Sequence, residues 1–338
     1  MTTEKRITHT DLLTWLDRLR ERGTVYVPAK DGTGDVALTE VSRAGSVVLE
    51  YGNFRASPKA FFFPQNQTLL HLRNGQAEEP RRADQRMTFL FGVRPCDARA
   101  LLALDDVFLS DEARDPYYAD LREKTVVISL ACTRSMSSCF CTSVGGGPGD
   151  EAGADVSALP LKADLLLRAQ TPKGEKLLSD ASDLLADAGP DSVERTEELL
   201  REVEDQIASL SVDRSTQQLP RAWDSALWDA VGRKCLGCGT CSFLCPTCHC
   251  FDITDEVRGG GGRRVRTWDC CAYPLFTLHG SGHNPRPTPR ERWRQRIMHK
   301  FRYAVENFDI PFCVGCGRCV RSCPAGLDLR TALKELGA

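Results

Sequence analysis

Two stretches of the chain repeat one spacing of four cysteines followed by a proline. Both follow the pattern C-x₂-C-x₂-C-x₃-C-P: the first contains Cys235, Cys238, Cys241 and Cys245, and the second contains Cys313, Cys316, Cys319 and Cys323. This pattern is typical of proteins that bind two 4Fe–4S clusters, in which the fourth cysteine of each run binds the cluster of the other run. The predicted ligands of one cluster are therefore Cys235, Cys238, Cys241 and Cys323, and those of the second are Cys313, Cys316, Cys319 and Cys245.

Zinc is the alternative metal for cysteines at such short spacing. A structural zinc site needs two C-x₂-C pairs, whereas this chain carries two complete four-cysteine runs. Small residues between the cysteines also let backbone amides approach the sulfurs of a cluster. These residues are Gly237, Gly239, Gly315 and Gly317. The spacing therefore favours two iron–sulfur clusters.

An earlier group of four cysteines could hold a third cluster. Its members are Cys96, Cys132, Cys139 and Cys141. The first follows a predicted buried strand at 87–93, and the second follows another at 125–130. If these strands are neighbours in a parallel sheet, the loops that follow them open on the same edge, so the four thiols would converge there. A 4Fe–4S cluster is the interpretation that four thiols favour; buried free thiols and a zinc site are the alternatives.

Four cysteines remain after these three sets are assigned. They are Cys248, Cys250, Cys270 and Cys271. Close packing of free thiols beside a cluster loop is the simpler interpretation. A fourth metal site is the alternative, but a C-x-C pair and a C-C pair leave little freedom to spread around a cube. We therefore expect packing, not ligation, for these four.

Charge and composition exclude several classes of protein. The net charge of −2 gives no broad basic surface for nucleic acid, and the apolar runs are far shorter than the roughly 18 residues of a membrane span. The first residues show no apolar signal core, so we expect a cytoplasmic protein whose 16 cysteines stay reduced. A basic segment at 286–302 could bind nucleic acid, but cations that stabilise anionic clusters or dock an acidic partner are the better interpretation.

The elements that would position these cysteines fall into two regions. Strands are predicted at 24–27, 36–38, 87–93, 125–130 and 164–169, and helices at 8–22, 97–108, 175–187 and 192–209. This alternation indicates an α/β domain. Strand patterns are sparse beyond residue 220, and the 67 residues between Cys245 and Cys313 are expected to be helix and loop. The predicted fold is α+β: an α/β domain over 1–220 that carries one cluster, then a mostly helical, ferredoxin-like two-cluster domain over 221–338.

No nucleotide site or catalytic residue is apparent. The glycine run at 259–262 lacks the G-x-G-x-x-G order and follows no predicted strand, so it indicates a turn. Without flavin or nucleotide, a chain of three 4Fe–4S clusters cannot take hydride from a nicotinamide and divide it into single electrons. We therefore expect a flavoprotein partner.

Four stretches resemble the iron–sulfur (beta) subunit of cytoplasmic sulfhydrogenases. They are residues 91–97, 132–142, 245–252 and 282–288. The chain is also similar to the iron–sulfur subunit of anaerobic sulfite reductase and to related subunits of heterodisulfide-reductase-type complexes, over about residues 85–335. The resemblance implies a non-catalytic electron-transfer subunit between a flavin- and NAD(P)-binding subunit and a catalytic subunit of hydrogenase or reductase type. It also implies that Cys96, Cys132, Cys139 and Cys141 hold a cluster.

Two other functions compete with an electron relay. The chain could itself reduce a small acceptor, such as polysulfide, at one cluster, which would need an iron with an open position. It could also be a redox sensor that loses a cluster in air. Three complete four-cysteine sets favour the relay, because full thiolate ligation leaves no iron open.

Overall fold

The chain forms two compact units. The computed structural model describes residues 4–41, 47–73, 75–80, 86–161 and 164–337. Unit 1 comprises Met1–Pro58, Arg86–Ser209 and Cys313–Gly317, and unit 2 comprises Lys59–Gln85, Leu210–Phe312 and Arg318–Ala338. Each unit is thus assembled from separate segments of the chain. The predicted division into domains 1–220 and 221–338 stays a prediction.

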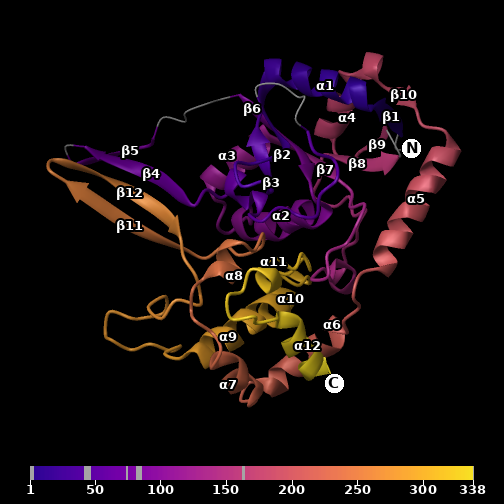
Figure 1. Ribbon diagram of the computed structural model, residues 1–338. Helices are drawn as coiled ribbons and strands as arrows, with labels where there is room; N and C mark the ends of the chain where they lie inside the picture. Colours follow the sequence, from indigo (N-terminus) through magenta and orange to yellow (C-terminus); the bar gives the residue numbers. More distant parts are fainter. Residues whose placement is uncertain (1–3, 42–46, 74, 81–85, 162–163, 338) are drawn as a thin grey trace. The chain divides into compact units, whose positions relative to one another are not determined.

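Unit 1 is built on one mixed sheet (Figure 1). Its strands are β1 (Lys5–Thr8), β2 (Gly23–Lys30), β3 (Val36–Glu40), β6 (Met87–Val93), β7 (Thr125–Leu130), β8 (Val156–Leu161), β9 (Asp164–Ala169) and β10 (Ala186–Asp187). They lie in the order β10-β1-β9-β8-β7-β6-β2-β3. The central strands β2, β6, β7 and β8 run parallel, and the outer strands pair antiparallel. The predicted strands over 87–93 and 125–130 are therefore parallel neighbours, as the convergence of the early cysteines requires.

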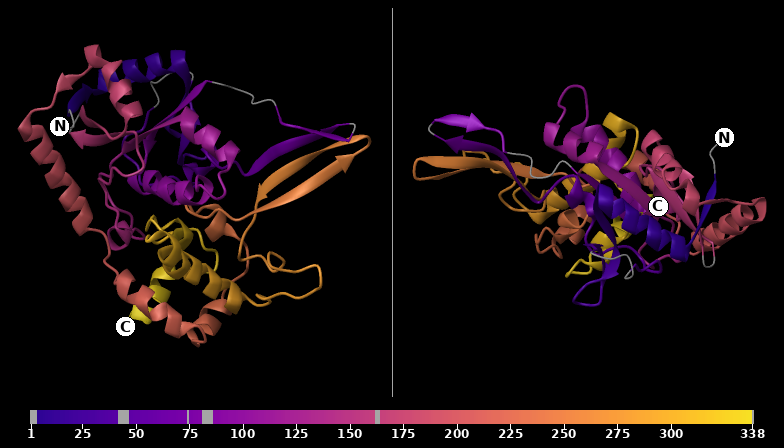
Figure 2. Two further views of the ribbon diagram at one scale, coloured as in Figure 1. Left: turned by 180° about the vertical axis from the view of Figure 1, so that it is seen from behind. Right: turned by 90° about the horizontal axis from the view of Figure 1, so that it is seen from above.

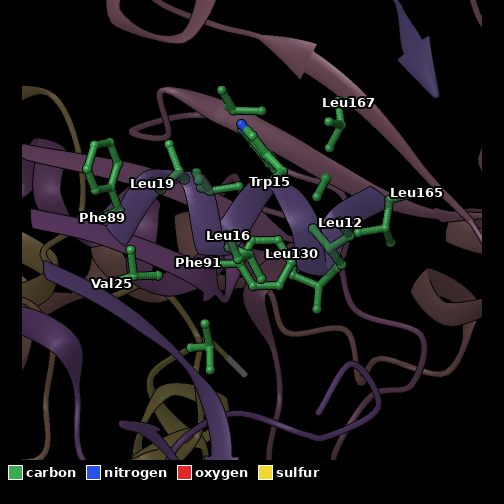
Figure 3. Packing of buried hydrophobic residues seen from close by; sticks show 14 of the residues in the cluster. Leu12, Trp15, Leu16, Leu19, Val25, Phe89, Phe91, Leu130, Leu165 and Leu167 are labelled. Carbon is green, nitrogen blue, oxygen red and sulfur yellow. The ribbon is translucent and has the colours of Figure 1, made fainter. Parts of the chain in front are cut away.

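The core of unit 1 lies between the sheet and α1 (His9–Arg22). The Oγ1 atom of Thr8 accepts a hydrogen bond from the backbone N of Asp11 and so caps the helix. Residues three and four apart on α1 form one apolar face. Figure 3 shows this face, with Leu12, Trp15, Leu16 and Leu19, packed against Phe91 and Leu130 of the central strands.

The other helices of unit 1 connect its strands. They are α2 (Pro95–Phe108), α3 (Pro116–Lys124), α4 (Pro172–Ser179) and α5 (Pro190–Asp205), with short 3-10 turns η3 (Cys141–Val144) and η4 (Ser182–Leu184). The helix predicted over 175–187 is shorter than expected. Residues 186 and 187 form β10 instead, because they pair antiparallel with β1 at the sheet edge.

Unit 2 contains a second, antiparallel sheet in the order β11-β12-β4-β5. Its strands are β4 (Asn66–Arg73), β5 (Gln76–Glu78), β11 (Phe251–Arg258) and β12 (Gly261–Trp268). Figure 2 shows the β11–β12 hairpin beside the β4–β5 hairpin from two further sides. The expectation that the segment between Cys245 and Cys313 is only helix and loop was therefore wrong.

The physical reason lies in the composition of the hairpin. Much of β11 and β12 is exposed, and charged side chains such as Asp255 and Arg264 pair across the strands at 2.8 Å. In β11, Asp255 interrupts the alternation of apolar Phe251, Ile253 and Val257, and β12 begins with two glycines and two arginines. The hydrophobic pattern by which strands are recognised is therefore weak. The glycine run at 259–262 does lie at the turn of this hairpin, as the sequence indicated.

The remaining elements of unit 2 are helical. They are α6 (Val212–Gln218), η5 (Leu219–Ala222), α7 (Leu227–Gly232), α8 (Thr240–Phe243), α9 (Pro289–Met298), η6 (His299–Tyr303), α10 (Ala304–Phe308), α11 (Arg318–Arg321) and α12 (Leu329–Gly337). The short helix η2 (Pro58–Phe61) links the first segment of unit 1 to unit 2. No helix among the described residues is both long and apolar enough to cross a membrane.

Candidate iron–sulfur sites

The four early cysteines surround one cavity in unit 1. Its lining includes Cys96, Cys132, Cys139 and Cys141. Cys96 lies in the first turn of α2, directly after β6, and Cys132 lies two residues beyond β7. Cys139 lies in the loop that leads into η3, and Cys141 is the first residue of η3. The structure therefore brings this set together at the edge where two parallel strands end, which is the geometry the sequence predicts.

A buried arginine supports the cavity from the sheet edge. Arg94, which is fully buried, follows a β-bulge at Gly92, where the register between β6 and β7 shifts. Its guanidinium donates hydrogen bonds to the backbone carbonyls of Gly52, Leu130, Ala131 and Tyr51. Burial raises the pKa of the Cys132 thiol, and the charge of Arg94 opposes that rise. The acceptors of these hydrogen bonds are neutral backbone carbonyls. The positive charge of Arg94 therefore remains available to the neighbouring thiols.

Burial raises the pKa of two thiols of this cavity, Cys132 and Cys141, and so favours their protonated form in the metal-free chain. Burial, together with the neighbouring Cys139 and Cys132, raises the pKa of Cys141 to about 12. A metal that replaces the proton reverses this preference, because thiolate coordination supplies the stabilisation that water would otherwise give. The site is therefore suited to thiolates that are bound to metal and not to free thiolates.

The beginning of the second cysteine run forms part of the same cavity wall. Gly315 and Cys316 line the cavity, and the backbone N of Phe140 donates to the carbonyl of Gly315 at 2.9 Å. The side-chain amide of Asn53 donates to the carbonyl of Cys316 at 2.7 Å. A Cβ atom on Gly315 would lie only 2.5 Å from the Cα of Cys141, so the two loops are in backbone contact. Two predicted cluster loops therefore touch within unit 1.

A second cavity, in unit 2, is lined by the predicted ligands of the first ferredoxin cluster. They are Cys235, Cys238, Cys241 and Cys323, and Cys319 lies in the same lining. Backbone amides approach two of the sulfurs: the N of Gly237 is 3.4 Å from the Sγ of Cys235, and the N of Leu327 is 3.3 Å from the Sγ of Cys323. Such N–H···S contacts stabilise a negatively charged cluster. That the fourth cysteine of one run faces the first three of the other agrees with the crossed assignment.

The Cys245 thiol has its own polar surroundings in unit 2. Its Sγ lies 3.3 Å from the Nζ of the buried Lys300 and 3.3 Å from the Oγ1 of Thr247. A hydrogen bond from Cys248 and the charges of Lys300 and Arg296 hold the pKa of Cys245 well below its usual range. These surroundings favour the anionic form of Cys245.

The four cysteines predicted to bind the second cluster are assigned to different units of the chain. Cys313 and Cys316 belong to unit 1, whereas Cys245 and Cys319 belong to unit 2. The assignment of these four to one cluster stays a prediction.

The basic segment at 286–302 contributes buried cations. Arg292, Arg294, Arg296 and Lys300 are all at least nine-tenths buried. The two last named reach cysteine sulfurs, at 3.6 Å for Arg296 with Cys248 and 3.3 Å for Lys300 with Cys245. The segment therefore fits the interpretation that cations stabilise anionic clusters.

Sequence reasoning did not single out Arg94 or Lys59 as site residues. Arg94 stands two residues before Cys96, but no local pattern marks Lys59.

The sets of cysteines around these cavities fit iron–sulfur clusters better than single metal ions. Among the described residues, no group of three or more His, Cys, Asp or Glu side chains could hold one metal ion. A cube spreads its four thiolates over four different irons, so its ligands do not converge on one point. Four thiols around a cavity, amides directed at sulfurs and buried cations nearby are the features that such a group requires.

Comparison with known proteins agrees with this chemistry. Residues 234–327 match the model of a 4Fe–4S dicluster domain. The chain is 32% identical over 332 residues to Sulfhydrogenase 2 subunit beta of Pyrococcus furiosus, and the alignment covers 95% of each protein. The chain belongs to the family of sulfhydrogenase beta subunits. The predicted resemblance is thereby confirmed, and the match extends into the N-terminal region, which the four motifs did not reach. Members of this family are iron–sulfur electron-transfer subunits, and the present chain is one of them.

Proposed function

We propose that this chain relays single electrons through three 4Fe–4S clusters within a multi-subunit oxidoreductase. The clusters would be held by the three cysteine sets described above, between a flavin- and NAD(P)-binding subunit and a catalytic subunit of hydrogenase or sulfur- or sulfite-reductase type. The observation that carries the proposal is the backbone contact between the Cys139–Cys141 loop and Cys313–Gly317 in unit 1. Loops in contact would hold two clusters close together, as a relay needs.

The side chains around the sulfurs have defined tasks in this proposal. When bound, a 4Fe–4S cluster supplies a centre that gains and loses one electron at a time. Asn53 and the Phe140 amide fix the loops in contact. Arg94, Arg296 and Lys300 place positive charge beside the thiolates and so favour the more negative, reduced state. Burial of these groups excludes water and strengthens each charge interaction.

A partner with flavin is required by the chemistry of nicotinamides. Hydride carries two electrons together, and a flavin can accept both and release them singly. The relative's printed name, a beta subunit of a sulfhydrogenase, supports an assembly of several different subunits. We therefore propose a stable complex with a flavin- and NAD(P)-binding subunit and a separate catalytic subunit.

The experiment compares the isolated, cluster-loaded chain with its complex, both purified without air. We expect NAD(P)H to bleach the clusters in the flavin-containing complex and to leave the isolated chain oxidised. Cys139→Ser in the complex should slow electron delivery to the terminal acceptor while flavin reduction proceeds normally. Ser137→Ala, an exposed change on the same loop, is the matched control. Oxidation of NAD(P)H by the isolated, flavin-free chain at the rate of the complex would overturn the proposal.

The same preparation separates the relay from the two competing functions. Rapid reduction of polysulfide by the isolated, reduced chain would indicate catalysis at a cluster. Loss of a cluster on brief exposure to air, with a change in partner binding, would indicate a sensor. Either result would contradict a relay with fully ligated clusters.

A further inference from the structure

A hairpin in unit 2 brings together the four cysteines that the ferredoxin pattern leaves unassigned. Phe251, at the start of β11, pairs with Trp268, at the end of β12. The ladder continues by one residue, because the backbone N of Asp269 donates to the carbonyl of Cys250 at 3.0 Å. Cys248 and Cys250 therefore lie directly before the first arm of the hairpin, and Cys270 and Cys271 follow shortly after the second arm.

The backbone ladder brings the ends of the two arms together. The backbone N of Asp269, which bonds to the carbonyl of Cys250, lies directly before Cys270 and Cys271, so these three cysteines lie at neighbouring positions of the hairpin base. Cys270 and Cys271 are buried, and Cys248 and Cys250 are partly buried. The sequence argued against a fourth metal site because a C-x-C pair and a C-C pair have little freedom to spread around a cube. The hairpin answers this argument in part, because two cysteines come from each arm and the four do not depend on one short loop.

Two buried cations lie beside Cys248, and one of them, Arg296, also lines the cavity of the first ferredoxin cluster. Lys59, which is 3% exposed, donates from Nζ to the carbonyl of Cys248 at 2.8 Å and to the carbonyl of Ser242 at 3.2 Å. Arg296, which is 4% exposed, directs Nη1 to the Sγ of Cys248 at 3.6 Å and to the Oγ of Ser242 at 3.2 Å. Lys59 also lies over the ring of Trp268, 4.1 Å from its centroid.

Buried cations require negative charge nearby, because removing them from water is unfavourable unless an anion compensates. Neutral thiols, backbone carbonyls and an aromatic ring offer only partial compensation. Thiolates bound to iron would supply the anion at the place where the two cations point.

We propose that Cys248, Cys250, Cys270 and Cys271 bind a fourth iron–sulfur cluster, separate from the clusters of the other twelve cysteines. Each arm of the hairpin supplies two thiolates, and Lys59 and Arg296 balance their charge. A single zinc ion is disfavoured, since no described group of side chains has the geometry for one ion. The inference goes beyond the three-cluster relay and does not depend on its direction or partners.

The test is the iron and acid-labile sulfide content of the full chain prepared without air. We expect the double variant Cys270→Ser/Cys271→Ser to contain about four irons fewer than the parent chain, as the loss of one cube requires. Thr254→Ser, an exposed change on β11, is the control and should keep the parent's content. Because the comparison is between variants, it stands whether or not the electron relay is confirmed.

A second pair of variants protects the result against misfolding. Cys248→Ser and Cys250→Ser change partly buried thiols, and each should alter one component of the Mössbauer and reduced-state paramagnetic resonance spectra while leaving the others intact. Unchanged iron, sulfide and spectra in all three variants would overturn the proposal. So would stoichiometric zinc that is lost with these cysteines, or a disulfide among them detected by mass in the parent chain.

Discussion

At the scale of single residues, buried cations are as important to the candidate sites as the cysteines. Lys300 contacts the Sγ of Cys245, the Oγ1 of Thr247 and the carbonyl of Phe312, all within 3.3 Å. A fixed positive charge at this distance in a water-poor interior interacts strongly with any extra negative charge on a neighbouring cluster. Such residues set how readily the cluster accepts an electron.

Replacement of Lys300 by methionine should therefore lower the reduction potential of the cluster beside Cys245. Methionine has a similar length without the charge, so the reduced state loses its electrostatic support. A tenfold loss of preference for the reduced state corresponds to about 59 mV for one electron. Potentiometric titration followed by paramagnetic resonance measures the shift. The exposed Lys234→Met is the control, and equal potentials in both variants would contradict the role of Lys300.

At the scale of elements, tight loops hold the thiols in place because glycine occupies positions that other residues cannot. Gly315 has a φ of +61° and lies in backbone contact with Cys141. Gly259, in the β11–β12 turn, has nearly the same φ of +62°, but a Cβ atom added there would have no neighbour within 4 Å. The two glycines share the conformational requirement and differ only in the close approach.

This difference makes a matched test of the loop contact. Gly259→Ala should cost about 1–2 kcal/mol of unfolding free energy, the usual penalty for a left-handed backbone, and should leave the iron content unchanged. Gly315→Ala adds a collision with the backbone at Cys141, so the loops must separate and iron should be lost as well. Urea unfolding and iron analysis measure both effects. Full iron content in Gly315→Ala would show that the contact is not needed.

At the scale of the whole molecule, a sheet core free of cysteine coexists with loops that depend on metal. The core of α1 and the central strands is built from aliphatic and aromatic side chains, and residues 1–95 contain no cysteine. Apolar burial alone can hold this part of unit 1. The cysteine loops, in contrast, lie mostly outside the helices and strands and would gain much of their order from the clusters.

Removal of iron by an anaerobic chelator should therefore unfold the chain unevenly. In hydrogen-exchange mass spectrometry, we expect β6, β7 and α1 to keep their protection while residues 132–148, 235–245 and 313–317 lose theirs. Re-addition of iron and sulfide should restore the protection of the loops. Equal loss of protection across β6 and the cysteine loops would indicate instead that the fold as a whole depends on metal.

The sequence by itself determined the chemistry of this protein and much of unit 1. Cysteine spacing is a local property, so the order of residues alone is enough for the two C-x₂-C-x₂-C-x₃-C-P runs to indicate cluster binding. The buried strands over 87–93 and 125–130 stand out because both faces are covered, and the structure gives them the same bounds. The helix from residue 8 to residue 22 is equally clear, since its apolar face repeats with the period of a helix.

Only the tertiary structure decided which distant residues meet. The β11–β12 hairpin was missed because Asp255 interrupts the apolar alternation of β11 and arginines fill much of β12. Without the hairpin, Cys250 and Cys270 could not be seen to approach each other. Lys59 lies far from every cysteine run in the sequence, yet it reaches the carbonyl of Cys248. Contacts of this kind depend on how strands pair and how segments pack, and neither is encoded in the spacing of neighbouring residues.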